Sequence, residues 1–318
     1  MSESTPIGLG MAAIGRPQYI NIKQERQEPF SLAEFKQKGF EMLNYAYDLG
    51  IRYFDTAPGY GIAEQLLIDW VKEKNDPTVN VATKWGYTYM ANFDLNAKVH
   101  EVKEHSLNKL NEQWKVSNQL FPYLKNYQIH SATFESGVLK NEVVLERLFQ
   151  LKEEHNIKIG LTTTGGNQAE IMVKAIDVHF KGNQLFEVFQ CTYNVLDQSI
   201  YELGHHIISD KKQLVIKEAL ANGRLFPNTD YPAYQHLYKK LETFSEKYQV
   251  GVDAIILQFC LTKLAGAIVL SGASKPEYLS QNLKATAFKL SSEEIEELVQ
   301  FKTTPKWYWE ERKQLTWN

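Results

Sequence analysis

Eight short runs of strand type alternate with stretches of helical pattern along this chain. The runs fall at residues 7–13, 51–54, 79–83, 126–129, 157–161, 186–190, 214–216 and 267–271. Such alternation predicts a parallel sheet, and eight strand-helix units that close on themselves make a (β/α)8 TIM barrel. We therefore expect an α/β protein with a single domain over residues 1–318, which ends in an aromatic tail from about residue 303.

Three of these runs end on a side chain that can take part in acid-base chemistry. Asp55, Lys84 and His130 each follow directly on such a run, and Tyr60 lies in the turn just beyond Asp55. A buried aspartate and an ordinary loop tyrosine would explain one stretch alone. Recurrence at three strand ends favours a site at the carboxyl ends of the barrel strands, where such barrels place catalysis. A doubly wound sheet is disfavoured, because it would scatter these ends along an open edge.

The same residues stand in motifs that resemble the aldo-keto reductase family. The stretch FDTAPGYG matches the family's FDTAxxYG, ATK ending on Lys84 matches its strand-end lysine, and YQIH ending on His130 matches its strand-end histidine. The likeness runs through nearly the whole chain, from Gly8 to Ser274. It implies a (β/α)8 barrel that works as an NAD(P)-dependent oxidoreductase.

The four residue types fit carbonyl reduction, which needs a hydride for the carbon and a proton for the developing alkoxide. A phenol is a poor acid or base near neutrality unless a close cation favours its phenolate, and Lys84 can be that cation if Asp55 holds it. Tyr60 then donates the proton in reduction and accepts it in oxidation, while His130 donates a hydrogen bond to the substrate oxygen. The resemblance implies the same roles.

A cofactor must supply the hydride, because no side chain can. In the family, a nicotinamide nucleotide lies across the barrel mouth, and a GxSN motif and a downstream glutamine hold its carboxamide. By this resemblance Thr162 and Thr163 replace the Ser and Asn, and Gln190 is the glutamine. Lys217 stands where the family often stacks a tyrosine on the nicotinamide. Thr162 keeps a hydroxyl, whereas Thr163 lacks the paired donor and acceptor of an amide.

The phosphate end of the nucleotide is predicted at the loop after the eighth strand, because the backbone N–H groups that open a helix there suit an anion. Family members restricted to the 2′-phosphate form usually carry an Arg where this chain has Tyr278. We therefore favour NADP(H) only slightly, and NAD(H) stays open. The residues expected to contact the nucleotide here are Gly272, Ser274, Lys275, Tyr278, Gln281 and Asn282.

Aromatic residues are predicted to form walls of the substrate pocket. Trp85 and Tyr87 are expected in a loop after the strand-end lysine, and Trp307 is expected in a tail that, by the resemblance, folds over the barrel mouth. A site that excludes water needs apolar walls around a few polar groups. Packing under a loop, or on the outer face of the barrel, is the alternative for these rings.

Helix limits are predicted from capping residues and helical spacing. Ser31 and Ser291 each precede a Glu by three residues, which is the spacing of a capping box. Residues 63–74 and 94–110 are predicted to be helices. Residues 111–125 are expected to form a connection longer than the family's common form, with no assigned role.

Composition limits what else the chain does. Hydrophobic residues make up 43% and charged residues 23% of the sequence, the net charge is -3, and no nucleic-acid partner is expected. Cys191 and Cys260 lie in apolar runs, so buried free thiols are favoured over a disulfide, and no metal site is predicted. No stretch approaches the ~18 apolar residues of a membrane span and no signal-peptide pattern opens the chain, so we predict a cytoplasmic protein.

Two functions are compatible with these residues. The first is an NAD(P)-dependent oxidoreductase, aldo-keto reductase or sugar dehydrogenase-like, that interconverts an aldehyde, ketone or sugar hemiacetal with the alcohol or lactone. The second is a slow-turnover regulatory or redox-sensing subunit that binds a nucleotide on the same barrel. The complete set of Asp55, Tyr60, Lys84 and His130 favours the enzyme. The small-molecule substrate, the physiological direction and the oligomeric state stay open.

Overall fold

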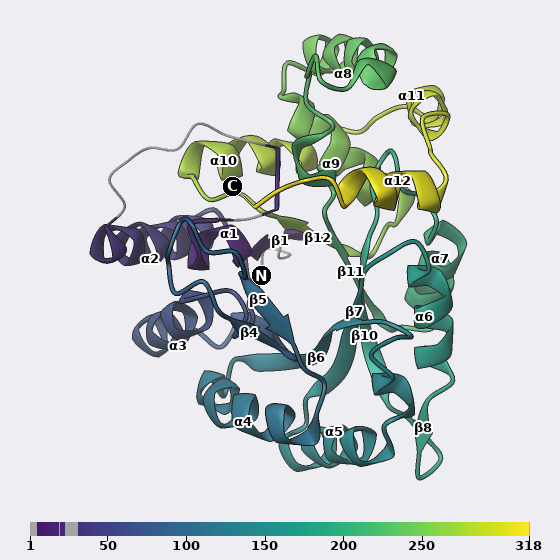
Figure 1. The fold of residues 1–318 in the computed structure, drawn as a ribbon. Coiled ribbons are helices and arrows are strands. Elements are labelled where there is room, and N and C mark those ends of the chain that lie inside the picture. The colour runs from purple at the N-terminus through teal and green to yellow at the C-terminus, as the bar shows by residue number, and fades with distance from the viewer. Residues whose placement is uncertain (1–4, 19, 23–30, 318) are drawn as a thin grey trace.

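The fold is a closed barrel of eight parallel strands, seen in a computed structural model that describes residues 5–18, 20–22 and 31–317 (Figure 1). The strands follow the order β1-β12-β11-β10-β7-β6-β3-β2, and β2 pairs with β1 to close the ring. This confirms the (β/α)8 prediction. The barrel strands are β1 (Ile7–Gly10), β2 (Tyr53–Asp55), β3 (Asn80–Trp85), β6 (Leu124–Ala132), β7 (Lys158–Thr163), β10 (Phe186–Thr192), β11 (Gln213–Lys217) and β12 (Ile268–Ser271).

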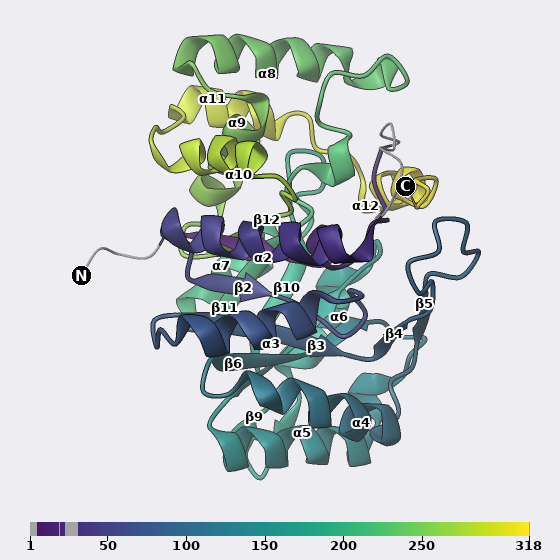
Figure 2. The same ribbon diagram turned by 90° about the vertical axis from the view of Figure 1, so that its left-hand side faces the viewer.

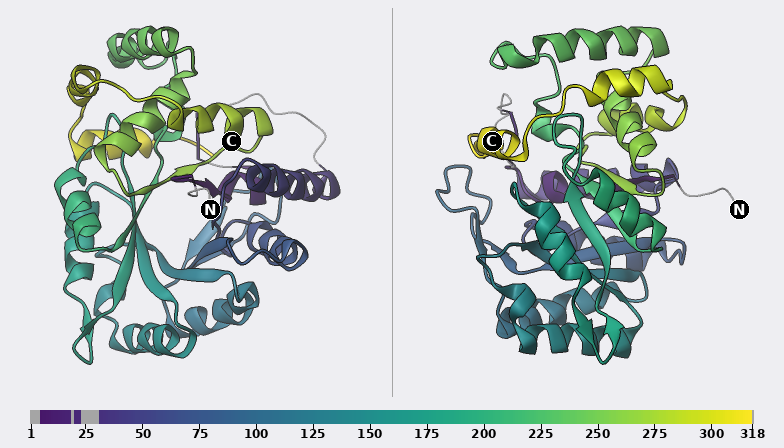
Figure 3. Two further views of the ribbon diagram at one scale, coloured as in Figure 1. Left: turned by 180° about the vertical axis from the view of Figure 1, so that it is seen from behind. Right: turned by 90° about the vertical axis from the view of Figure 1, so that its right-hand side faces the viewer.

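Helices surround the barrel and bury their apolar faces on it. The predicted helix over residues 63–74 is α3, and Ser31 and Ser291 cap α2 and α11 through their side-chain oxygens, with a complete capping box at Ser291. The helices are α1 (Ala12–Gly15), α2 (Leu32–Asp48), α3 (Ala63–Lys74), α4 (Leu107–Ser117), α5 (Glu142–His155), α6 (Gln168–Ile176), α7 (Tyr201–Ser209), α8 (Gln235–Tyr248), α9 (Val252–Lys263), α10 (Pro276–Leu283), α11 (Ser292–Val299) and α12 (Pro305–Arg312). Figure 3 shows α8 outside α9, which explains why α9 is apolar on nearly every side.

The barrel interior is apolar in its middle and polar at its mouth. A buried cluster separate from the main core contains Tyr53, Ala82, Val188, Val215 and Leu270. Strand residues two apart point the same way, so the side chains two residues beyond the first four of these also point inward. They are Asp55, Lys84, Gln190 and Lys217. The polar side chains therefore form a layer at the carboxyl ends of the strands, and the apolar layer lies directly beneath it inside the barrel.

The connection between β3 and β6 differs from its prediction. Residues 94–110 are not one helix, because β5 (Glu101–Lys103) pairs antiparallel with β4 (Tyr87–Tyr89) in a hairpin, and α4 begins only after the N-cap Ser106. The expected long connection over residues 111–125 is instead the second half of α4, a short 3-10 turn and the start of β6. The residue types of the Tyr-Thr-Tyr and Glu-Val-Lys segments suit β-strands, but the two segments that pair lie far apart in sequence.

The hairpin and the C-terminal helix mark the mouth of the barrel. Figure 2 shows β4, β5 and α12 at the same end of the molecule, where the carboxyl ends of the barrel strands meet. Both cysteines are free and buried, as predicted. Among the described residues, no helix is long and apolar enough to cross a membrane, and no three His, Cys, Asp or Glu side chains are grouped to hold a metal ion.

Candidate active site

Asp55, Lys84 and His130 come together because β2, β3 and β6 are neighbours in the barrel. All three side chains lie at the carboxyl ends of their strands and are buried, with exposed fractions of 2%, 0% and 8%. Tyr60 reaches them from the loop between β2 and α3, and its hydroxyl oxygen lies 3.4 Å from Nε2 of His130. The structure thus brings the four predicted catalytic side chains into one cluster.

A buried ion pair forms the base of this cluster. Nζ of Lys84 donates to Oδ2 of Asp55 at 2.5 Å and to the carbonyl oxygen of Thr56 at 3.0 Å. The other carboxylate oxygen of Asp55 accepts a hydrogen bond from Nε2 of Gln190 at 2.8 Å. Both charges are therefore compensated within the protein, which is what a buried pair requires.

The Tyr60 loop is fixed by close packing against the end of α1. Gly61 has a φ of +63°, and a Cβ on Gly15 would lie only 2.0 Å from the carbonyl oxygen of Tyr60. The N–H of Ile62 donates to the carbonyl oxygen of Gly15 at 2.9 Å. Gly61 must be glycine because of its positive φ and its close contact with Gly15, and Gly15 must be glycine because a Cβ has no room there.

Burial keeps the Tyr60 phenol protonated. Burial is the main cause that raises the pKa of Tyr60 well above its ordinary value, Asp55 raises it further, and Arg16 opposes the shift. We expected Lys84 to favour the phenolate, and its Nζ does lie 4.6 Å from the centre of the Tyr60 ring. The Asp55 carboxylate offsets that charge, so the phenol is held ready to donate a proton.

His130 is a neutral imidazole in this site. Burial lowers its pKa well below the ordinary value, and the nearby charges of Lys84 and Arg16 lower it further. The ring of Tyr87 packs on it with 4.6 Å between centroids. The next residue, Ser131, has a φ of +52°, and its N–H donates to Oγ1 of Thr162 at 2.8 Å. This hydrogen bond fixes the strand end that carries the imidazole.

A cleft of about 210 Å³ opens above the cluster and has charged walls. Arg16 pairs with Glu101 at 2.8 Å on the hairpin side, and Arg312 pairs with Glu218 at 2.7 Å on the opposite side. The lining residues are Arg16, Ile20, Tyr60, Tyr87, Glu101, His130, Ser131, Thr162, Thr164, Gln190, Lys217, Glu218, Arg312 and Trp317.

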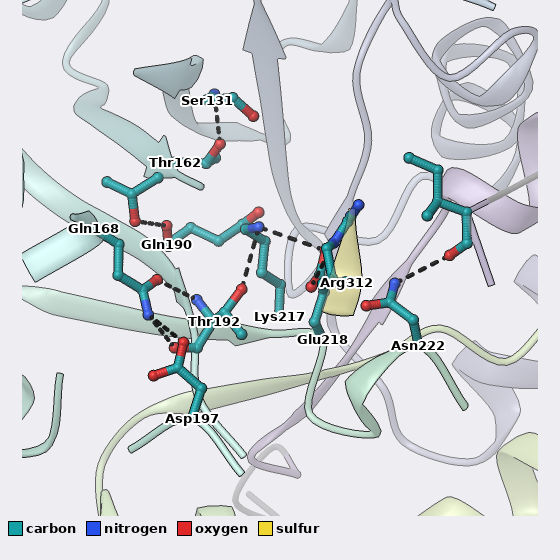
Figure 4. A network of polar contacts seen from close by, with 12 residues as sticks. Ser131, Thr162, Gln168, Gln190, Thr192, Asp197, Lys217, Glu218, Asn222 and Arg312 are labelled. Carbon is teal, nitrogen blue, oxygen red and sulfur yellow. Dashed lines mark hydrogen bonds and ion pairs between the residues drawn. The ribbon is translucent and has the colours of Figure 1, made fainter. Parts of the chain in front are cut away.

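Figure 4 shows Thr162, Gln190 and Lys217, three of the predicted nicotinamide residues, within their network of polar contacts. Nζ of Lys217 is 3.5 Å from Oγ1 of Thr192 and 3.9 Å from Oε1 of Glu218, whose carboxylate also binds Arg312. Thr162, Gln190 and Lys217 line the cleft, whereas Thr163 is fully buried and does not.

The residues predicted for the phosphate end of the nucleotide gather at the start of α10. Gly272, Ser274, Lys275, Tyr278 and Gln281 are exposed there, and a Cβ on Gly272 would meet no atom within 4 Å. The sixth predicted residue lies elsewhere: Asn282 is 3% exposed, and its amide bonds Ser271 at 2.6 Å and Asp253 at 2.5 Å. Its amide atoms therefore hold the helix to the barrel.

The predicted aromatic walls are placed differently from one another. Tyr87 lines the cleft, but Trp85 ends β3, is fully buried and packs edge-on against His105 at 5.5 Å. Trp307 is 56% exposed on the outer side of α12 and is not among the lining residues. The tail instead contributes Arg312 and Trp317 to the cleft.

The tail is held over the mouth by its other two aromatic residues. Tyr308 accepts a hydrogen bond from Nδ2 of Asn194, and Nε1 of Trp309 donates to Oδ2 of Asp197, at 3.0 and 3.1 Å. Arg224 packs on the Tyr308 ring, with 4.2 Å from its Cζ to the ring centre. These contacts fix α12 on the loops that follow β10 and β11.

Glu64 is a buried acid beside the site that the sequence did not single out. It lies in the first turn of α3 and is 3% exposed. Its Oε1 accepts hydrogen bonds from the hydroxyls of Thr83, at 2.5 Å, and Ser117, at 2.9 Å. Burial raises its pKa from 4.5 to about 7, while these two hydrogen bonds and the charge of Lys84 oppose the rise.

Glu64 is expected to make the stability of the fold depend on pH. Because the pKa of Glu64 is raised in the folded state, the contribution of its neutral carboxyl group to the free energy of unfolding is complete below about pH 4.5. This contribution is lost as the pH rises to about 7. Each pKa unit corresponds to about 1.4 kcal/mol, so the loss in free energy of unfolding is about 3 kcal/mol. Between pH 4.5 and 8, the free energy of unfolding of Glu64→Gln should fall by about 3 kcal/mol less than that of the wild type. Urea unfolding at the two pH values measures this difference. Equal pH dependence in both proteins would show that Glu64 is charged in the fold.

Comparison with known proteins gives one consistent result. The Aldo/keto reductase family model matches residues 6–302. The chain is 26% identical over 293 residues to an uncharacterized oxidoreductase of Bacillus subtilis, which covers 84% of this chain and 89% of the relative. It is also 26% identical over 252 residues to L-galactose dehydrogenase of Arabidopsis thaliana, with 76% and 75% covered.

Solved structures show the same fold. An aldo-keto reductase from Klebsiella pneumoniae in complex with NADP and acetate aligns with a TM-score of 0.69 at 19% identity, over 95% of this chain and 92% of that one. Glycerol dehydrogenase from Gluconobacter oxydans aligns with a TM-score of 0.69 at 20% identity, over 94% and 91%. With a family match over nearly the whole length and the four predicted catalytic residues gathered at the barrel mouth, this chain belongs to the aldo/keto reductase family of oxidoreductases.

Proposed function

We propose that this protein is an NAD(P)-dependent oxidoreductase that interconverts a small polar carbonyl compound and its alcohol, with Tyr60 as the group that transfers the proton. The observation that carries the proposal is the packing of Tyr60 and His130 above the compensated Lys84–Asp55 pair, at the floor of a cleft. The named relatives are an oxidoreductase and dehydrogenases, and they lend no support to a regulatory subunit with slow turnover.

The chain's own residues divide the work of the reaction. A bound nicotinamide nucleotide supplies or accepts the hydride. Tyr60 is protonated in the resting site, so it donates its proton to the substrate oxygen during reduction. His130 is neutral and can donate a hydrogen bond to the same oxygen without adding a charge. Lys84 is held by Asp55 beside the phenol, where its ammonium stabilises the phenolate that forms.

The cleft has the groups that a nicotinamide nucleotide needs. The Thr162 hydroxyl and the Gln190 amide line it, beside Tyr60 and His130, and both can bond a carboxamide. At the start of α10, the exposed segment from Gly272 to Lys275 offers backbone N–H groups and a cationic side chain to a phosphate. These features support binding of the nucleotide between the two places.

The walls of the cleft favour a polar substrate. Two ion pairs, Arg16 with Glu101 and Arg312 with Glu218, give hydrogen-bond donors and acceptors on opposite sides. A purely apolar ligand would remove water from these ion pairs without offering hydrogen bonds in return, which costs binding free energy. We therefore propose small hydroxylated aldehydes, ketones or sugar hemiacetals as the substrate class, consistent with two relatives named for L-galactose and glycerol.

We expect NADPH to bind only about 5- to 30-fold more tightly than NADH, a difference of about 1–2 kcal/mol. The exposed Lys275 can meet a 2′-phosphate as a point charge, but Tyr278 stands where a bidentate arginine clamp would be, and Lys275 lies 5.5 Å over its ring. Fluorescence titration measures both affinities. Lys275→Met should remove the preference and leave NADH binding unchanged. A preference above a thousandfold would reveal a phosphate clamp at another residue.

A substrate panel tests the proposed function. Simple aldehydes, ketones, hydroxylated aldehydes and sugars are offered with NADPH or NADH for reduction, and the matching alcohols and sugars with NADP+ or NAD+ for oxidation. Nicotinamide absorbance reports turnover. We expect the highest kcat/KM for hydroxylated compounds, whereas a preference for unsubstituted aryl or alkyl carbonyls would contradict the proposed substrate class.

A further inference from the structure

We propose that Arg16 is a positioning residue that orients Tyr60 and adds a second positive charge, beside that of Lys84, that stabilises its phenolate, and that Glu101 partly offsets the Arg16 charge. The inference rests on the proposed proton-transfer role of Tyr60. It concerns two residues that come from outside the barrel strands, since Arg16 follows α1 and Glu101 belongs to β5 of the hairpin.

The contacts of Arg16 fix both its own side chain and the Tyr60 loop. The residue is 4% exposed, and its Nη1 donates to the carbonyl oxygen of Gly59 at 3.0 Å and to Oε2 of Glu101 at 2.8 Å. Its Cζ lies 5.1 Å from the centre of the Tyr60 ring and 4.6 Å from the centre of the Trp317 ring. Arg16 therefore holds the peptide bond next to Tyr60 and contacts the phenol ring itself.

Arg16 adds a second cation beside the phenol, and its partner Glu101 is more exposed than Asp55, the partner of Lys84. Lys84 and Asp55 are both buried and in direct contact, so the Asp55 carboxylate offsets part of the field of the ammonium. The side chain of Glu101 is 24% exposed, against 4% for Arg16, so water screens the carboxylate more than the guanidinium. Glu101 therefore offsets the Arg16 charge less completely than Asp55 offsets the Lys84 charge.

The signs of the two charges separate an electrostatic role from a purely structural one. Arg16 lowers the pKa of Tyr60, whereas Glu101 raises it, although burial and Asp55 contribute more. Neutralising Arg16 should thus raise the pKa of the phenol, whereas neutralising Glu101 should lower it. If the two residues only held the Tyr60 loop in place, both substitutions would shift the pKa of the phenol in the same direction. In the part of the chain that the structure describes, the titratable groups that act on Tyr60 include Asp55, Lys84, His130, Arg16, Glu101 and Glu218.

The protonation step involves one proton on the Tyr60 oxygen. In alcohol oxidation the substrate O–H bond breaks, its proton bonds to the Tyr60 oxygen, and the hydride leaves the substrate carbon for the oxidised nicotinamide. In reduction the same proton returns to the alkoxide. A charge that stabilises the phenolate makes Tyr60 the stronger acid for reduction, and in oxidation it raises the fraction of phenolate that can accept the proton at neutral pH.

The direct test reads the ionisation of position 60 in the cofactor-free full chain. A difluorotyrosine at position 60, which ionises at lower pH than tyrosine, is titrated by ¹⁹F NMR in the wild-type, Arg16→Met and Glu101→Gln backgrounds. We expect the pKa to rise in Arg16→Met and to fall in Glu101→Gln. Arg16→Lys keeps the charge and should restore most of the wild-type pKa. Shifts of the same sign in Arg16→Met and Glu101→Gln, or no shift in either, would overturn the proposal.

The kinetic test uses the same variants with the best substrate of the panel. Arg16→Met should lower kcat by about tenfold at neutral pH, a fraction of the whole acid-base contribution, whereas Glu101→Gln should raise kcat. A loss of kcat in both Arg16→Met and Glu101→Gln would mark the pair as structural only. If the protein turned over no substrate, the NMR titration would still decide the inference, so its failure is distinct from failure of the proposed function.

Discussion

Tyr60→Phe should lower kcat by about 10²- to 10⁴-fold, because it deletes the proposed proton donor and leaves the ring in place. The phenol oxygen has few ties to the fold: it lies 3.4 Å from Nε2 of His130, while Arg16 and Lys84 contact the ring. Stability and nucleotide affinity should therefore stay close to wild type. Steady-state kinetics and fluorescence titration measure the two effects.

A matched control is available on the same face of the cleft. Tyr87→Phe also removes one hydroxyl from a cleft-lining ring that packs against His130, but that phenol has no assigned part in proton transfer. We expect it to keep kcat within about tenfold of wild type. A Tyr60→Phe enzyme that retains more than about a tenth of wild-type kcat would point to another proton donor.

Lys84→Met should damage both stability and turnover. The change leaves the Asp55 carboxylate buried without its ammonium partner, and breaking such a pair costs about 3–5 kcal/mol. It also removes the cation beside the phenol, so kcat should fall by about 10²-fold or more. Chemical unfolding and steady-state kinetics measure these two losses separately.

The double variant Asp55→Asn with Lys84→Met separates the two losses. Asn at position 55 carries no charge and can still accept the hydrogen bond from Gln190. We expect most of the lost stability to return, because no buried charge is left unpaired. Turnover should remain low. Recovery of turnover together with stability would show that the ion pair serves the fold alone.

The barrel was predictable from sequence because it depends on local pattern. Eight apolar runs, each separated by helical spacing, determine the strands, and short-range signals such as Ser291 with Glu294 determine helix ends. The hairpin was not predictable in this way. Its strands, Tyr87–Tyr89 and Glu101–Lys103, pair across an intervening loop, and three-residue strands give too short a pattern to compete with helical spacing.

The same division explains which cleft residues were found. Asp55, Lys84 and His130 follow strands, so the barrel itself places them together. Arg16 and Glu101 come from a loop and a hairpin, and only tertiary packing shows that they meet.

Outside the strands, the residue type alone did not indicate whether a side chain is buried or exposed. Glu64 occupies the first turn of a helix, where an acidic residue is ordinary, so nothing in the sequence marked it as buried. Trp307, Tyr308 and Trp309 are consecutive on one helix. Helical geometry turns the first to solvent and the other two to the barrel, which composition cannot indicate.

Transfer of deuterium from the cofactor tests the central claim most directly. The protein is incubated with nicotinamide nucleotide deuterated at the hydride position and with the best carbonyl substrate of the panel, and the product is analysed by mass spectrometry. We expect deuterium on the former carbonyl carbon of the alcohol, formed at a rate that falls with Tyr60→Phe. Product that carries no deuterium from either face of the labelled nicotinamide, or that forms equally fast without the Tyr60 hydroxyl, would contradict hydride transfer at this site.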